Sequence, residues 1–151
     1  MHTLMNVQFS IEDIRLLNLQ YSVVREEALS DEIEGKAPEK ERISIPVELT
    51  CSSDYQAEKS LLKVTVAISI KDPNPGYRLS AEIGGIFHLH ADPEEDLLNR
   101  LRLVSCPAIL FPYLREAVSE VSRRGGFEPF YLPPANFIKM YESAEEKAGT
   151  K

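Results

Sequence analysis

The chain reads Cys106-Pro-Ala-Ile-Leu-Phe-Pro-Tyr-Leu-Arg-Glu116, preceded by Gly84-Gly-Ile-Phe87 and followed by Ser122-Arg-Arg-Gly-Gly-Phe127 and Pro134-Ala-Asn-Phe137. These four blocks consist largely of apolar and aromatic residues interrupted by Pro and Gly. They contain no nucleophile motif, no set of metal ligands and no phosphate-binding loop. Such a composition suits packing and the capture of apolar surface.

Around these blocks, apolar residues recur at helical spacing. A first helix is predicted to begin at an Asp92-Pro93 cap and to be interrupted at Pro107. A second helix is predicted to end at Gly125, and a last helix to start near Pro134. The apolar stripe of the second helix consists of Leu110, Leu114, Ala117, Val118 and Val121.

The first half of the chain alternates apolar and polar residues with the period of a β-strand. A strand over residues 7–23 changes parity, so it needs a bulge or bend near residues 12–16. Residues 43–50 predict a second strand, which lies at an edge or is bulged because Pro46 lacks an N–H. A third strand is predicted at 62–70 and a fourth at 77–89.

Strands first and helices afterwards predict an α+β fold, a four-stranded antiparallel sheet with helices packed on one face. The 151 residues fit one domain spanning 1–151, with frayed ends at 1–6 and 146–151. Residues 26–41 hold seven acidic residues and little that is apolar, which indicates an acidic connecting loop.

Composition excludes several classes of function. The net charge of −7 disfavours nucleic acid as a partner, because an acidic protein repels phosphates. No signal peptide and no apolar run of membrane-spanning length is visible, so we expect a cytoplasmic protein without membrane insertion. Cys51 and Cys106 are expected to be reduced and without a chemical role, Cys51 at a strand end and Cys106 buried.

The titratable residues offer little chemistry. His88 and His90 share one face of a strand near Asp92 and Glu94, as a metal pair would. Two ligands at this spacing are common by chance, so we interpret the pair as solvent-exposed residues at a strand end. Gly84-Gly85 indicates a bulge or a close backbone approach. The sequence predicts no enzyme, no metal and no cofactor.

Aromatic residues concentrate in the second half of the chain, where seven of the twelve Phe and Tyr lie between residues 111 and 141. Most of them fit core packing, but the consecutive large groups of residues 130–132, in a Pro-rich loop, cannot all point inward. We therefore predict a peptide-binding groove formed by this loop, the last helix and the second strand. Its residues are Ile43, Ile45, Val47, Phe127, Phe130, Tyr131, Leu132, Phe137, Met140 and Tyr141.

The four quoted blocks resemble the SecB family of bacterial protein-export chaperones, and the resemblance covers about residues 84–141. Family members carry Gly-Gly-Ile-Phe, Cys-Pro-x-Ile-Leu-Phe-Pro-Tyr-x-Arg-Glu, Ser-Arg-Gly-x-Phe-Pro and Pro-x-Asn-Phe. The third block is one residue longer here, and Glu128 separates Phe127 from Pro129. The resemblance implies an ATP-independent holdase that forms a homotetramer, a dimer of dimers. Such a holdase binds unfolded, export-competent polypeptides in apolar grooves and passes them to the SecA motor, partly through an acidic sheet surface.

Two departures from the family affect these implications. The first strand reads Leu17-Asn-Leu-Gln-Tyr21 in place of a Ser-Phe-Glu pattern, and the tail ends Lys147-Ala-Gly-Thr-Lys151 without an acidic extension. The resemblance to the family therefore supports holdase activity for this chain more strongly than it supports docking to SecA. The alternatives are a SecB-like chaperone dedicated to an antitoxin, a single-partner adaptor, and a metal-binding protein using His88 and His90.

Overall fold

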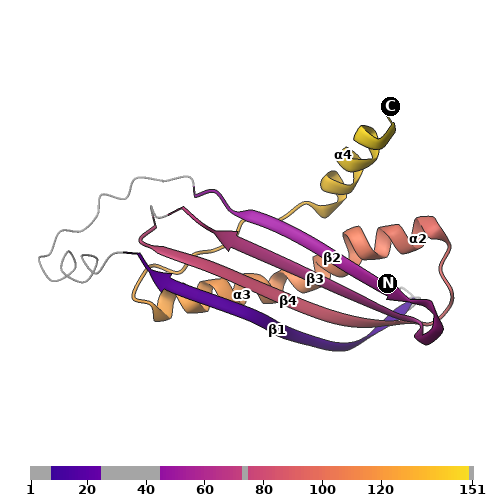
Figure 1. Cartoon of the computed structure of the whole chain (residues 1–151), viewed down its shortest axis with the longest axis horizontal. Coiled ribbons are helices and arrows are strands. Elements are labelled where there is room, and N and C mark those ends of the chain that lie inside the picture. Colours follow the sequence, from indigo (N-terminus) through magenta and orange to yellow (C-terminus); the bar gives the residue numbers. More distant parts are fainter. Residues whose placement is uncertain (1–7, 25–44, 73–74, 150–151) are drawn as a thin grey trace, which may run out of the picture.

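The computed structural model describes residues 8–24, 45–72 and 75–149. Its four strands form one antiparallel sheet in the spatial order β1-β4-β3-β2, and a long helical segment crosses one face of that sheet (Figure 1). The strands are β1 (Phe9–Val23), β2 (Glu48–Gln56), β3 (Leu61–Ile70) and β4 (Tyr77–Leu89). This architecture confirms the predicted α+β fold. The helical elements are the 3-10 turn η1 (Ala57–Lys59), α2 (Glu95–Arg100), the π-helical turn η2 (Leu101–Ser105), α3 (Cys106–Arg124) and α4 (Phe137–Gly149).

The two central strands, β3 and β4, agree with the prediction. Alternate side chains of each strand face the helices, and the pairing sets Val66 opposite Ile83 and Leu62 opposite Phe87. All four side chains are buried. Full burial of a large apolar side chain contributes about 1.5–3 kcal/mol to stability, so this pair of strands supplies much of the core.

β1 forms one edge of the sheet. Its register with β4 shifts after Ile11 and again after Leu16, which confirms the irregularity predicted near residues 12–16 and adds a second one. Leu16 is paired with the buried Ile83 and therefore faces the helical side of the sheet. The bulges thus turn apolar residues of both sequence parities toward the same side.

β2 corrects the strand predicted at residues 43–50. It begins at Glu48, and Ile45 and Val47 belong to the segment before it. Pro46 cannot donate to a strand ladder, whereas the polar residues 51–56 can form an edge strand that faces solvent. Cys51 is consequently an exposed residue in the middle of β2, opposite Val66, and not at a strand end. Ile43 and the predicted loop 26–41 lie outside the described residues.

The helical segment after β4 differs from the prediction at two places. The predicted Asp92 cap is wrong, because α2 begins at Glu95 with no side-chain cap, and Asp92 instead accepts a hydrogen bond from the Tyr55 hydroxyl at 3.4 Å. Pro107 does not end the helix. The N–H of Cys106 donates to the carbonyl of Leu101, five residues back, and this wider turn accommodates the proline ring.

α3 packs its apolar stripe on β3 and β4, with Leu110, Leu114 and Val118 fully buried. Gly85 allows the close approach, since a Cβ at this position would lie 2.7 Å from Cδ2 of Leu110. The predicted close backbone approach at the double glycine is therefore confirmed. Gly126, with φ at 89°, follows the end of α3 in the left-handed conformation that glycine favours.

α4 begins at Phe137 and is capped by its preceding residue, since the N–H of Lys139 donates to Oδ1 of Asn136 at 3.0 Å. This helix packs against η2 and extends away from the sheet (Figure 1). The segment between α3 and α4, residues 125–136, forms neither helix nor strand. We call this segment the strap.

Candidate peptide-binding surface

The strap is held against the core along its length. The ring of Phe127 lies 4.8 Å from that of Tyr77, and the N–H of Phe130 donates to Oγ of Ser122 at 2.9 Å. Leu132 is only 2% exposed and belongs to the core. Residues of the strap that pack on the core alternate with residues that face solvent. The strap therefore has a defined outer surface although it lacks secondary structure.

The predicted groove residues separate into three groups by their exposure. Tyr131 is 72% exposed and Met140 47% exposed, so both offer apolar surface to a ligand. Leu132 and Phe137 are buried in the core, where Phe137 makes an edge-to-face contact with Phe111 at 5.7 Å. The remaining described members are partly buried and pack against the core: Ile45, Val47, Phe127, Phe130 and Tyr141.

A shallow hollow of about 320 Å³ lies beside Tyr131, between the strap and α3. Its lining combines the phenol ring and a proline with charged and polar side chains of α3, and Glu120 among them forms an ion pair with Arg124 at 3.1 Å. The hollow is thus apolar on the strap side and charged on the helix side. It is lined by Glu116, Ser119, Glu120, Arg123, Pro129 and Tyr131.

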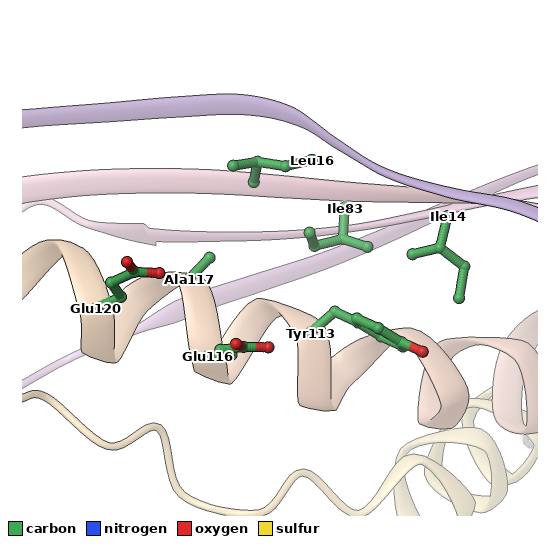
Figure 2. A pocket seen from close by; sticks show the side chains of 7 residues that line it. All are labelled: Ile14, Leu16, Ile83, Tyr113, Glu116, Ala117 and Glu120. Atoms are coloured by element: carbon green, nitrogen blue, oxygen red, sulfur yellow. The ribbon is translucent and has the colours of Figure 1, made fainter.

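A second, more apolar hollow of about 230 Å³ lies between β1 and α3 (Figure 2). Leu16 and Ile83 extend from the strands toward Ala117 and Tyr113 of the helix. Leu16 is 47% exposed and Tyr113 48% exposed. The hollow forms because α3 packs mainly on β3 and β4, so the helix-facing side of the edge strand β1 is left partly uncovered.

The exposed apolar row continues along β1 beyond this hollow, through Ile11, Leu19 and Val23. This surface was not predicted from the sequence. The signal was present, because β1 carries apolar residues at both parities across its bulges. Alternation alone could not show that α3 would leave the row uncovered.

Cys106 is fully buried, as predicted, and this burial raises the pKa of its thiol to about 12. The rings of His88 and His90 lie 5.5 Å apart. Within residues 8–24, 45–72 and 75–149, no group of three His, Cys, Asp or Glu could hold a metal ion.

The outer face of the sheet, opposite the helices, carries charges of both signs. Nζ of Lys71 lies 3.1 Å from a carboxylate oxygen of Glu48, and Nε of Arg15 lies 2.6 Å from one of Asp13. All four residues are exposed or near the surface, so each pair contributes little to stability. Cations thus lie beside the carboxylates of Glu48 and Asp13 on this face. In the described part of the chain, no helix is long and apolar enough to cross a membrane.

Comparison with known proteins identifies the family. The model of the preprotein translocase subunit SecB family matches residues 5–148, and the chain therefore belongs to the SecB family. The protein-export protein SecB of Nitrosospira multiformis is 32% identical over 142 residues, which cover 92% of this chain and 84% of that protein. The SecB of Acidithiobacillus ferrooxidans is 34% identical over 99 residues, covering 64% of this chain and 66% of that protein, just under two thirds of its length.

A solved structure supports the same fold. The SecB-like chaperone of Mycobacterium tuberculosis, in complex with a peptide from an antitoxin, superimposes with a TM-score of 0.65 at 24% identity. The superposition covers 85% of this chain and 91% of that protein. At this identity the likeness concerns the fold alone.

Proposed function

We propose that this protein is an ATP-independent holdase chaperone that binds unfolded or export-competent polypeptides in the cytoplasm. The observation that carries the proposal is the ring of Tyr131, held out into solvent by a strap anchored on both sides of it. A strap that buries Leu132 and exposes the neighbouring Tyr131 ring offers a surface suited to apolar partners. Membership of the SecB family supports the same function.

Holding a client requires no chemical step, so we propose no catalytic role, metal or cofactor. Client segments would bury apolar area against Tyr131, Met140 and the partly buried groove residues, at about 25 cal/mol per Å². The strap is already ordered by Ser122 and Leu132, so binding costs little additional ordering entropy. Apolar contacts do not select one order of side chains, which predicts low sequence specificity.

Delivery of clients to the Sec translocation machinery is a further step that the family suggests. On the sheet face, Glu48 and Asp13 each pair with a cation, so these two carboxylates are partly neutralised for such docking. We therefore propose the holding step for this chain in preference to docking on SecA through an acidic sheet.

A second candidate function is that of a chaperone dedicated to an antitoxin. It is favoured by one observation, the likeness to the M. tuberculosis SecB-like chaperone, whose structure contains an antitoxin peptide. The two candidates differ in client range, because a dedicated chaperone binds one partner and ignores unrelated unfolded chains.

We also propose a homotetramer, a dimer of dimers. The apolar row on β1 and the hollow beneath it support this assembly, because a second copy would cover Leu16, Leu19 and Tyr113.

An aggregation-suppression assay tests the holdase function. An unrelated protein is diluted from denaturant with and without this chaperone, in the absence of nucleotide, and light scattering is followed. The proposal expects stoichiometric suppression of scattering. If unrelated clients aggregate unimpeded while an antitoxin is protected, the dedicated function replaces the general one.

A further inference from the structure

Ser122 is the only buried polar or charged residue among the described residues, and its side chain is fully inaccessible. It lies in the last turn of α3. Its hydroxyl oxygen lies 2.9 Å from the carbonyl of Val118 and 3.0 Å from that of Ser119, to either of which it can donate. The same oxygen accepts from the N–H of Phe130 at 2.9 Å. A hydroxyl has one proton and two lone pairs, so it can donate to α3 and accept from the strap at once.

This hydrogen bond fixes the strap next to its most exposed ring. Phe130 packs against the core, Leu132 is buried, and Tyr131 between them is exposed. Phe130 and Leu132 both face the core, so the residue between them faces outward. Fixing the backbone N–H of Phe130 therefore determines that Tyr131 projects outward, beside the hollow along α3.

We propose that Ser122 is a positioning residue for client binding, an inference that rests on the holdase function proposed above. Its hydroxyl holds the strap so that Tyr131 is presented to the client with little freedom left to lose. The bond to Phe130 is a side-chain hydrogen bond that joins α3 to the strap. Without it, Leu132 still anchors the strap, but the segment that carries Tyr131 loses one of its fixed points.

Removal of the Ser122 hydroxyl would also lower the stability of the fold if its role were only structural. The test must therefore separate a loss of stability from a change in how Tyr131 is held for the client. A double-mutant cycle does this. Ser122→Ala and Tyr131→Ala are made singly and together, and dissociation of a fluorescently labelled, permanently unfolded polypeptide is measured for each. Exchange of the Phe130 amide hydrogen reports whether the strap has loosened.

We expect Ser122→Ala to speed both amide exchange and client dissociation, the latter by about 3- to 10-fold, the effect of one net hydrogen bond. Ser122→Thr keeps the hydroxyl and should restore slow dissociation. In the Tyr131→Ala background, Ser122→Ala should add little. Val118→Ala, one turn earlier and equally buried, is the matched control. It should lower the melting temperature without changing dissociation from the folded protein.

Two results overturn the inference. One is faster Phe130 exchange in Ser122→Ala with client dissociation unchanged; the other is an equal effect of Ser122→Ala in both backgrounds. If Ser122→Ala does not fold, the hydrogen bond can be removed at its donor instead, because Phe130→Pro lacks the backbone N–H. Phe130→Ala, which keeps the N–H, is its control. Equal rates of client dissociation from these two variants would overturn the proposed role of Ser122. If Tyr131→Ala alone leaves binding unchanged while wild type still suppresses aggregation, the binding surface is misassigned and the holdase function stands.

Discussion

The side-chain hydroxyl of Tyr21 lies against the backbone of Gly125, so close that a Cβ at position 125 would overlap with it. The contact joins the end of β1 to the end of α3. The Tyr21 oxygen is buried and has no hydrogen-bond partner in the described structure, and this desolvation raises the pKa of Tyr21. The Tyr21 ring also stacks near Tyr77, 5.6 Å away, which in turn contacts Phe127 of the strap. The absence of a side chain at Gly125 thus allows Tyr21 of β1 to pack against the end of α3.

Gly125→Ala should destabilise the protein by about 1–3 kcal/mol, the cost of overpacking. The backbone of Gly125 is ordinary helical, with φ at −72°, so the cost comes from the clash with Tyr21. Tyr21→Phe removes the clashing oxygen and an unsatisfied hydroxyl, so it should be neutral or slightly stabilising alone and should restore part of the stability of Gly125→Ala. Denaturant unfolding of the four proteins measures the coupling. Additive effects would show that the two residues do not interact.

Tyr131→Ala should weaken client binding by about 1–2 kcal/mol, on the scale of the apolar area that the ring would bury. Its effect on stability should be small, because the ring is largely exposed. Leu110→Ala, a fully buried change, should instead cost about 2–5 kcal/mol in unfolding free energy. Client titration and thermal melting of both variants check the contrast. A large loss of stability in Tyr131→Ala with unaltered client affinity of the folded fraction would mean that the ring belongs to a structural contact.

The sequence predicted correctly those strands that bury one face in the core and leave the other face more exposed. β3 and β4 alternate clearly because one face of each is core, and their bounds were predicted within a residue. The second half of β2 escaped prediction because an edge strand with polar residues on both faces has no alternation. The helix end predicted at Pro107 was wrong, because the residues around a proline do not reveal that a π-helical turn can accommodate its ring within a continuous helical segment. In the candidate surface, composition showed that the rings of the strap could not all be buried, but only the fold separates Tyr131 from Leu132.

Leu16→Asp should weaken self-association. Leu16 lies in the hollow between β1 and α3, where a second copy would bury it, and a buried, unpaired carboxylate is costly. Gln20→Asp is the matched control, because Gln20 pairs with the uncharged Ser80 on the opposite face of the same strand. Light scattering should show a tetramer for wild type and the control, and a smaller mass for Leu16→Asp. A wild-type mass of 17.0 kDa, that of one chain, would rule out the assembly.

Cys106 should make stability fall as pH rises above about 8.5, the ordinary pKa of a thiol in an unfolded chain. Burial raises its pKa to about 12 in the folded protein, so between these values the unfolded chain releases a proton that the folded chain retains. The unfolded state then binds fewer protons, and linkage requires the free energy of unfolding to decrease with pH.

Cys106→Ala leaves a small cavity but removes this titration, so its unfolding free energy should depend less on pH between 8 and 10. Both proteins contain the same tyrosines and the same Cys51, so the titration of these groups cancels in the comparison. Parallel pH profiles for the two proteins would show that Cys106 ionises equally in the folded and unfolded states.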